Sequence, residues 1–262
     1  MFDYLNEIKV GDNIISEING KNENMLMDTK VVKIAKGEKV SYLSSSKETA
    51  VLHLSGNIQI IWEDKTYSNK RTSLFDEEPC CLHVPSNIEI TVVAMEESEI
   101  LVQQTENEKK FQSKLYTEDN IKSDIFGDKV AGGTCRRVVR TIFDFNNAPY
   151  SNMVMGEVIT YPGRWSSYPP HHHPQPEIYF YRFDKEQGFG ACFIGEDAFK
   201  IKHNSIANIP GGLVHPQTSA PGYAMYYCWM IRHLKDNPWT SRIDDEAHTW
   251  ILKEDAEIWE GK

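Results

Sequence analysis

Four prolines in a short histidine-rich stretch restrict the local fold of this chain more than any other feature. The stretch reads Tyr161-Pro-Gly-Arg-Trp-Ser-Ser-Tyr-Pro-Pro-His-His-His-Pro-Gln-Pro-Glu177, and the four prolines that surround its histidines are at 169, 170, 174 and 176. Proline lacks an amide donor and disfavours helix both at its own position and at the preceding one. The stretch is therefore predicted to be extended, and it leads directly into the aromatic segment Ile178-Tyr-Phe-Tyr-Arg182.

The spacing of the polar side chains in this stretch predicts a metal site. In an extended chain alternate side chains point to the same side, so His171 and His173 can share a face while His172 points elsewhere. Imidazole and carboxylate groups are the usual protein ligands of zinc, iron and manganese. We therefore expect His171, His173 and Glu177 to bind one metal ion, with His172 in solvent or behind the ligands.

Segments typical of β-strands lie on both sides of this stretch. Examples are Asn57-Ile-Gln-Ile-Ile-Trp62 and Met153-Val-Met-Gly-Glu-Val-Ile-Thr160, which are rich in β-branched residues and bounded by turn formers. The segment 105–132 is highly charged and has no sustained apolar period, which is typical of a linker or crossover. The sequence thus predicts an all-β protein with few short helices, divided into halves 1–104 and 133–262.

Composition restricts the partners of the protein. The net charge of −10 argues against general binding of nucleic acid or of an anionic membrane. The N-terminal residues do not resemble a signal peptide, and no apolar segment is long enough to span a bilayer. Five cysteines, including the adjacent pair Cys80-Cys81, do not form the pattern of a disulfide framework. A cytoplasmic protein without membrane or nucleic-acid partners is expected.

The segment Pro210-Gly-Gly-Leu-Val-His215 is the second informative motif. Pro-Gly-Gly predicts a tight turn, because glycine accepts positive φ without a Cβ clash. Together with the first stretch, this motif resembles the two-part signature of cupins. The resemblance implies double-stranded β-helix (jelly-roll) barrels, two of them in this bicupin. It also implies that His171, His173, Glu177 and His215 hold one divalent metal ion, zinc or manganese rather than iron, with coordination positions open for substrate.

The first half has the same layout without the ligands. The segments 37–56 and 79–86 occupy the places of the two motifs but lack the histidine pair, so this half resembles a degenerate cupin without metal. We interpret His53 and His83 as packing residues. Glu157, on a predicted strand before the site, is a weak candidate for a cavity-facing group. A structural role is also expected for the histidines outside any motif, His203, His233 and His248.

Phrases around the metal motif resemble the 5-deoxy-glucuronate isomerase family of myo-inositol catabolism. They are Gly156-Glu-Val-Ile-Thr160, Trp165-Ser-Ser-Tyr-Pro-Pro-His171, Glu177-Ile-Tyr-Phe-Tyr-Arg182, Gln187-Gly-Phe-Gly190 and Pro221-Gly-Tyr-Ala-Met-Tyr-Tyr227. The 4-deoxy-5-keto-uronate isomerases of pectin breakdown share the bicupin layout and the Pro-Pro-His-x-His pattern. Compared with the inositol-pathway enzymes, the segment between His173 and Glu177 is shorter here, and the second motif has one extra residue before its histidine.

The resemblance implies a metal-dependent aldose–ketose isomerase, an intramolecular oxidoreductase that converts 5-deoxy-glucuronate to 2-deoxy-5-keto-gluconate. Tyr179 and Tyr181 alternate with Glu177, so both are expected on the ligand face, either for proton transfer or for packing. A substrate carboxylate favours an arginine, and Arg164 is the nearest candidate, because strand parity points Arg182 away.

Three other functions remain open from the sequence. The same ligands suit an isomerase of 4-deoxy-5-keto-uronate, a cupin dioxygenase, or a cupin that binds a sugar without catalysis. Oxygen consumption separates the dioxygenase from the isomerases, because isomerisation needs no oxygen. The oligomeric state is also open, with a homo-oligomer among the alternatives.

Overall fold

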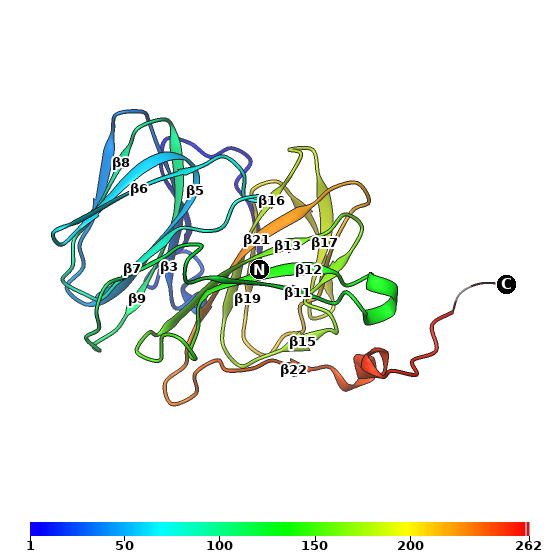
Figure 1. The fold of residues 1–262 in the computed structure, drawn as a ribbon. Coiled ribbons are helices and arrows are strands. Elements are labelled where there is room, and N and C mark those ends of the chain that lie inside the picture. The colour runs from blue at the N-terminus through cyan, green and yellow to red at the C-terminus, as the bar shows by residue number, and fades with distance from the viewer. Residues whose placement is uncertain (260, 262) are drawn as a thin grey trace.

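The computed structural model describes residues 1–259 and 261, and nearly all its regular structure is β-strand (Figure 1). The first strands are β1 (Phe2–Tyr4), β2 (Gly11–Ser16), β3 (Asp28–Ile34), β4 (Lys39–Tyr42), β5 (Lys47–Trp62), β6 (Lys65–Arg71), β7 (Cys81–Val84), β8 (Ile90–Ala94), β9 (Ser98–Glu106) and β10 (Lys114–Tyr116). The strands that follow are β11 (Lys122–Phe126), β12 (Arg137–Phe143), β13 (Met153–Thr160), β14 (Trp165–Ser166), β15 (His171–His172), β16 (Glu177–Phe183), β17 (Phe189–Ile194), β18 (Asp197–Lys202), β19 (Ser205–Ile209), β20 (Gln217–Ser219), β21 (Met225–Arg232) and β22 (Ile243–Asp244). Short 3₁₀ helices are η1 (Glu23–Met25), η2 (Val130–Gly133) and η3 (Glu246–Leu252).

The long strand β5 takes part in two layers of the N-terminal half. Its first part pairs with β7 and β9, whereas its last part pairs with β6 and β8. Gly56 lies where the strand changes partners, with φ of 97°, and a Cβ there would collide with the backbone of Glu97 and Ser98. Aliphatic side chains, Val51 and Ile60 among them, pack together in the interior of this half.

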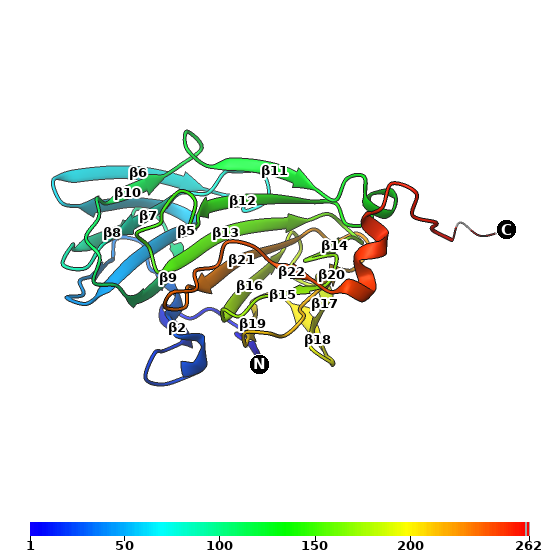
Figure 2. The same ribbon diagram turned by 90° about the horizontal axis from the view of Figure 1, so that it is seen from below.

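The C-terminal half is built on a seven-stranded sheet in the order β1-β19-β16-β21-β13-β12-β11 (Figure 2). A four-stranded sheet, β14-β20-β17-β18, and the pair β15–β22 complete this half. Side chains alternate between the two faces of β16. Tyr179 and Tyr181 pack with Cys192 of the smaller sheet, whereas Ile178 and Phe180 belong to a different core. Both faces of the strand are therefore buried, which explains its continuous apolar sequence.

That second core lies between the two halves. It combines Leu52 and Cys81 of the N-terminal half with Phe180 and Cys228 of the seven-stranded sheet. The two halves thus share one hydrophobic interface, and each half has a further core of its own. The predicted all-β class with few short helices is confirmed.

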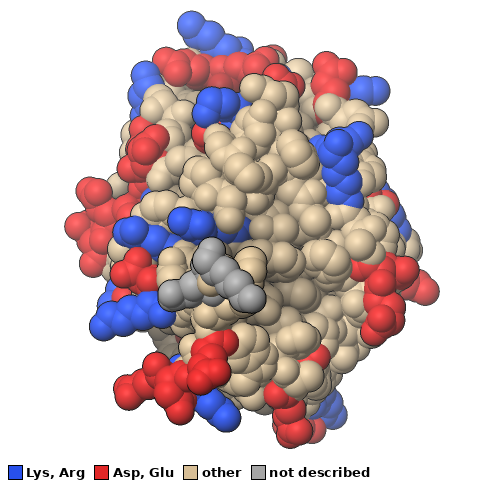
Figure 3. Space-filling model, turned by 90° about the vertical axis from the view of Figure 1, so that its right-hand side faces the viewer, with Lys and Arg blue, Asp and Glu red and all other residues tan. Residues whose placement is uncertain are grey.

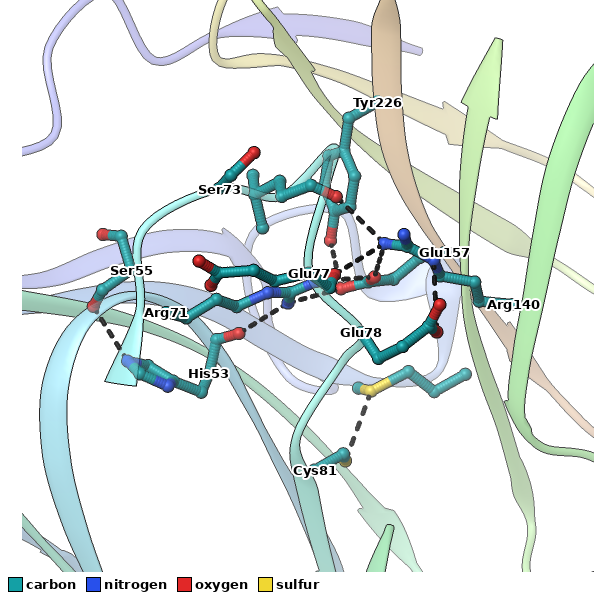
Figure 4. Close-up of polar contacts among 12 residues, drawn as sticks. His53, Ser55, Arg71, Ser73, Glu77, Glu78, Cys81, Arg140, Glu157 and Tyr226 are labelled. Atoms are coloured by element: carbon teal, nitrogen blue, oxygen red, sulfur yellow. Dashed lines mark hydrogen bonds and ion pairs between the residues drawn. The ribbon is translucent and has the colours of Figure 1, made fainter. Parts of the chain in front are cut away.

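A buried ionic cluster crosses this interface (Figure 4). Arg71, at the end of β6, donates to both carboxylate oxygens of Glu157 on β13, at 2.7 and 2.8 Å. Arg140 lies 3.4 Å from the same carboxylate, and the Tyr226 hydroxyl donates to it at 2.9 Å. Glu157 therefore faces the N-terminal half, and its weak candidacy as a cavity-facing group is wrong. Residues 153, 155 and 159 of β13 belong to the same interface core, as strand parity requires.

The strand pairing does not follow the order of the chain. β1 pairs with β19, so the first residues join the sheet of the C-terminal half. β11, within the segment expected to be a linker, pairs with β12 of the same sheet. The division at residues 104 and 133 stays a prediction. None of the helices in the described residues is long and apolar enough to cross a lipid bilayer.

The two histidines of the N-terminal half are buried in hydrogen-bonded surroundings. Nδ1 of His53 lies 2.7 Å from the Asn69 amide nitrogen. Nε2 of His83 lies 2.8 Å from the Glu48 carboxylate, and its ring stacks on Phe143 with centroids 4.4 Å apart. These contacts fit the packing role expected for both residues.

Candidate metal centre

Three side chains of the two sequence motifs meet in the C-terminal half. Nε2 of His173 lies 3.1 Å from Oε2 of Glu177, and Nε2 of His215 lies 3.2 Å from the same oxygen. One nitrogen or oxygen atom from each of the three residues lies within 4.8 Å of the others, and all three residues are buried. Two imidazoles and a carboxylate at this separation form a candidate site for a divalent metal ion.

Backbone contacts hold the two motifs together. The amide of Gly212 donates to the carbonyl of His173 at 2.7 Å, and the amide of His215 donates to that of His171 at 3.3 Å. A Cβ at Gly211 would collide with the carbonyl oxygen of Pro174. The glycines after Pro210 therefore allow the second loop to lie directly against the proline-rich stretch, which brings His215 to the other ligands.

The protonation of the imidazoles suits metal binding. In each of the three rings, Nδ1 lies close to the backbone carbonyl oxygen of a nearby residue. The distance is 3.2 Å from His171 to residue 169, 3.0 Å from His173 to residue 175 and 2.7 Å from His215 to residue 213. A carbonyl oxygen only accepts, so each Nδ1 carries the proton and each Nε2 of a neutral ring presents a lone pair. In neutral rings the Nε2 lone pairs of His173 and His215 would face the carboxylate, an arrangement that a cation between them would stabilise. Without a cation, the same nitrogens favour the ionised carboxylate as N–H donors. The residues fit a metal ion.

The charge states of the site also fit a cation. Burial alone would raise the pKa of Glu177, but its contacts with His173 and His215 outweigh burial and lower that pKa to about 2. The carboxylate is therefore ionised at neutral pH. Burial, followed by the neighbouring imidazole of His215, lowers the pKa of His171 well below its usual value, so the ring of His171 is neutral.

His171 lies beside the cluster of three. Its ring centroid is 4.9 Å from that of His215, and its side chain lines the same cavity as Glu177. His172 is half-buried and pairs with Ile243 on β22. The structure brings together His173, Glu177 and His215 as expected, and the role of His171 as the fourth ligand stays a prediction.

The site opens into a cavity of about 490 Å³. Tyr179 lines this cavity and donates a hydrogen bond to Oε2 of Glu177 at 3.1 Å. Tyr181 lies deeper on the same face and donates to Gln217 at 2.5 Å, away from the lining of the cavity. Arg164, expected to meet a substrate carboxylate, is also not part of the lining. Its backbone carbonyl accepts hydrogen bonds from the hydroxyl of Thr218 and the amide of Ser219.

Several cavity residues were missed by sequence reasoning. The guanidinium groups in the lining are those of Arg137, at the start of β12, and Arg242, in the C-terminal segment. The ring centroid of Trp239 lies 6.2 Å from that of His173 and 5.5 Å from that of Trp229. Alternation along β12 places residues 137, 139 and 141 on one face, but nothing in the sequence indicates that this face borders the metal ligands.

Known proteins resemble this chain over almost its full length. Residues 4–251 match the family model described as KduI/IolB family. The 5-deoxy-glucuronate isomerase of Bacillus licheniformis is 25% identical, over 95% of this chain and 96% of the relative. The protein of the same name from Bacillus subtilis strain 168 is 24% identical, over 94% of this chain and 96% of the relative.

Solved structures agree in fold. An IolB-like protein from Salmonella typhimurium LT2 superposes with a TM-score of 0.85 at 19% identity, covering 96% of this chain and 99% of that one. An oxalate decarboxylase from Lactobacillus farciminis has a TM-score of 0.66 at 11% identity, covering 93% and 88%. A cupin-like fold is thus confirmed. The resemblance noted in the sequence is also confirmed, because the curated relatives are isomerases of the expected name, and the chain belongs to the KduI/IolB family.

Proposed function

We propose that the protein is a metal-dependent aldose–ketose isomerase that converts 5-deoxy-glucuronate to 2-deoxy-5-keto-gluconate. The observation that carries the proposal is the convergence of His173 and His215 on Glu177, which lines the cavity. The names of the curated relatives support the choice of sugar acid. We assign His171 as the fourth ligand because its ring is neutral and lies next to that of His215.

The chemistry of the reaction suits such a centre. Aldose–ketose isomerisation moves hydrogen between two adjacent carbons and develops negative charge on their oxygens. A divalent cation bound here would act as a Lewis acid on the substrate carbonyl and the neighbouring hydroxyl. Glu177, ionised and buried, provides the negative charge that favours such a cation over protons.

Two tyrosines of the cavity are hydrogen-bond donors. Burial raises the pKa of Tyr179 well above its usual value, and the charge of Glu177 raises it further, so the phenol stays protonated. Burial also raises the pKa of Tyr227, whose hydroxyl lies 2.7 Å from that of Ser166. Tyr179 orients the carboxylate of Glu177, and Tyr227 presents a polar group to the substrate. Tyr181, which lies behind the lining, packs the site rather than transferring protons.

An assay with two sugar acids tests the proposal. Purified protein, stripped with a chelator and reloaded with zinc or manganese, is incubated with 5-deoxy-glucuronate or 4-deoxy-5-keto-uronate while ketose formation and oxygen are followed. We expect turnover of the first, loss of turnover without metal, and no oxygen uptake. Turnover of 4-deoxy-5-keto-uronate alone would instead show an isomerase of pectin breakdown. Oxygen uptake would show a dioxygenase, and binding without turnover would show a sugar-binding cupin.

The finer architecture belongs to the same proposal. We infer a bicupin of two jelly-roll barrels, residues 1–104 and 133–262, in which the first barrel has lost its metal ligands. Its core is mainly aliphatic, with Ile58, Ile60 and Val92, and the candidate metal-binding group found among the described residues lies in the other half. All five cysteines are buried free thiols, which suits the reducing cytoplasm.

A further inference from the structure

Arg137 is a buried cation without an anionic partner in the described part of the chain. Only 7% of the residue is exposed. Its guanidinium donates to two backbone carbonyls, that of Cys135 at 2.9 Å and that of Tyr168 at 3.5 Å, and lies over the ring of Phe126. Burial of a charge without an opposite charge is unfavourable, so such groups are normally paired.

The other buried arginines of the described residues follow that rule. Arg71 and Arg140, with 1% and 4% exposure, both contact the carboxylate of Glu157. Arg140 lies on the same strand as Arg137, three residues further along, and so points to the opposite face. One strand therefore presents a neutralised arginine to the interface between the halves and an unneutralised arginine to the cavity.

A second cation borders the same cavity. Arg242 lines it from the C-terminal segment and keeps one third of its side chain exposed, with a single ion pair from Nε to Asp244 at 2.9 Å. Burial is the main cause that lowers the pKa of Arg137, and the charge of Arg242 lowers it further. The two charges are thus close enough to repel each other. An anion between them would reduce the repulsion and would give Arg137 the opposite charge that it lacks.

The cavity joins these cations to the candidate metal centre. Its lining includes both arginines, His171 and Glu177, together with the hydroxyl-bearing side chains of Ser167 and Tyr227. A sugar acid carries a carbonyl at one end and a carboxylate at the other. A single molecule can therefore present its carbonyl to the metal and its carboxylate to the arginines.

We propose that Arg137 and Arg242 bind the carboxylate of the substrate and so select sugar acids over neutral sugars. Arg137 supplies the rigid, buried part of this subsite, and Arg242 closes it from the more exposed side. The assignment rests on the proposed isomerase function for the identity of the substrate. The selectivity for a carboxylate rests only on the unpaired charge in the cavity.

Kinetics on an acid and a neutral sugar test the assignment. Arg137→Gln is expected to lower kcat/KM for 5-deoxy-glucuronate roughly 100-fold, and Arg242→Gln about tenfold. Activity on 5-deoxy-glucose, which has a hydroxymethyl group in place of the carboxylate, should stay at the level of the unsubstituted protein. Arg137→Lys should fall between, because lysine keeps the charge but loses the fork geometry.

Calorimetric binding of gluconate and sorbitol gives a readout that does not depend on turnover. The metal-loaded protein should prefer gluconate, and both glutamine variants should lose the preference. Arg136→Gln is the matched control, because Arg136 pairs with Asp128 outside the cavity lining. Arg242 is partly exposed, so its variant serves if Arg137→Gln fails to fold.

The outcomes separate the two proposals. Failure of the unsubstituted protein to turn over 5-deoxy-glucuronate, with an arginine-dependent preference for gluconate, would remove the isomerase function and support the carboxylate subsite. Turnover that survives Arg137→Gln and Arg242→Gln, with gluconate still preferred, would overturn the subsite. A loss confined to Arg164→Gln would overturn it as well and return the role to the arginine expected from the sequence.

Discussion

Three consecutive histidines of this chain have different surroundings. His171 and His173 are almost completely buried at the candidate metal centre, whereas His172 is half-buried beside β22. Simple alternation in the proline-rich stretch predicted this difference, because prolines force an extended backbone and leave little freedom to reorient the side chains. The ligand set was thus the part of the site most accessible from sequence.

Single alanine substitutions should reproduce the difference between the histidines. We expect His173→Ala and His215→Ala to abolish stoichiometric zinc binding, and His171→Ala to do the same if it is the fourth ligand. His172→Ala should bind zinc like the unsubstituted protein. Metal content by mass spectrometry, with affinity by competition against a chelator, measures the effect. Zinc binding that survives loss of His215 would contradict the site.

Protonation of Glu177 should make the metal-free protein sensitive to acid. Its folded pKa of about 2 lies below the ordinary pKa of 4.5 for this side chain, so its ionised form stabilises the fold above about pH 4.5. That contribution is lost as the pH falls towards 2. Glu177→Gln, which mimics the protonated acid, should lower the free energy of unfolding of metal-free protein by up to about 3 kcal/mol at pH 7. Urea titrations at pH 7 and pH 3 should show the difference shrinking at the lower pH, and a constant difference would speak against it.

At the scale of elements, the cavity is assembled from strands and loops that are distant in the sequence. The ligands come from β16 and the loops before β16 and β20, the arginines come from β12 and the C-terminal segment, and Trp239 precedes β22. Periodicity predicted the strands and the faces of β16. It could not predict Arg137 or Arg242 as cavity residues, because the neighbour of each face depends on strand order, which is a non-local property.

The C-terminal segment should matter to activity through Trp239. Its indole packs against Trp229 in the cavity wall, and β22 holds the segment against β15. Trp239→Ala is expected to lower kcat/KM about tenfold through a looser, wetter cavity, while zinc content is unchanged. Trp250→Ala, at an exposed position of η3, is the control and should leave kinetics unaltered. Equal kinetics for both variants would exclude a role of the segment in the site.

At the scale of the whole molecule, the positions of the charged side chains are more informative than the net charge. The end from which the C-terminal segment extends has a large uncharged centre, with charged side chains mainly around its rim (Figure 3). The few charges inside are paired at the interface between the halves, as at Arg71 and Glu157, or gathered at the cavity. Sequence composition gave the sign of the total charge. It could not distinguish Arg140, which is neutralised by Glu157, from Arg137, which is not.

The Arg71–Glu157 pair should couple the two halves energetically. Arg71→Met leaves a buried carboxylate with fewer partners and is expected to lower the free energy of unfolding by about 3–5 kcal/mol. The double variant Arg71→Met/Glu157→Leu should recover part of that loss, because the carboxylate that had lost Arg71 is itself gone, while Arg140 keeps its ion pair with Glu78. Urea unfolding of the single and double variants forms a complete cycle. Strictly additive losses would show that the pair contributes no coupling.

The pairing of β1 with β19 has a consequence for the order of events during synthesis. Residues 2–4 are made about 200 residues before the strand they pair with, residues 205–209. The sheet that carries Glu177 thus gains this edge strand only after residues 205–209 have been made. The amide of Asn208 also bonds the carbonyl of Met1 at 2.7 Å, so a fusion partner attached directly before Met1 would emerge beside this edge.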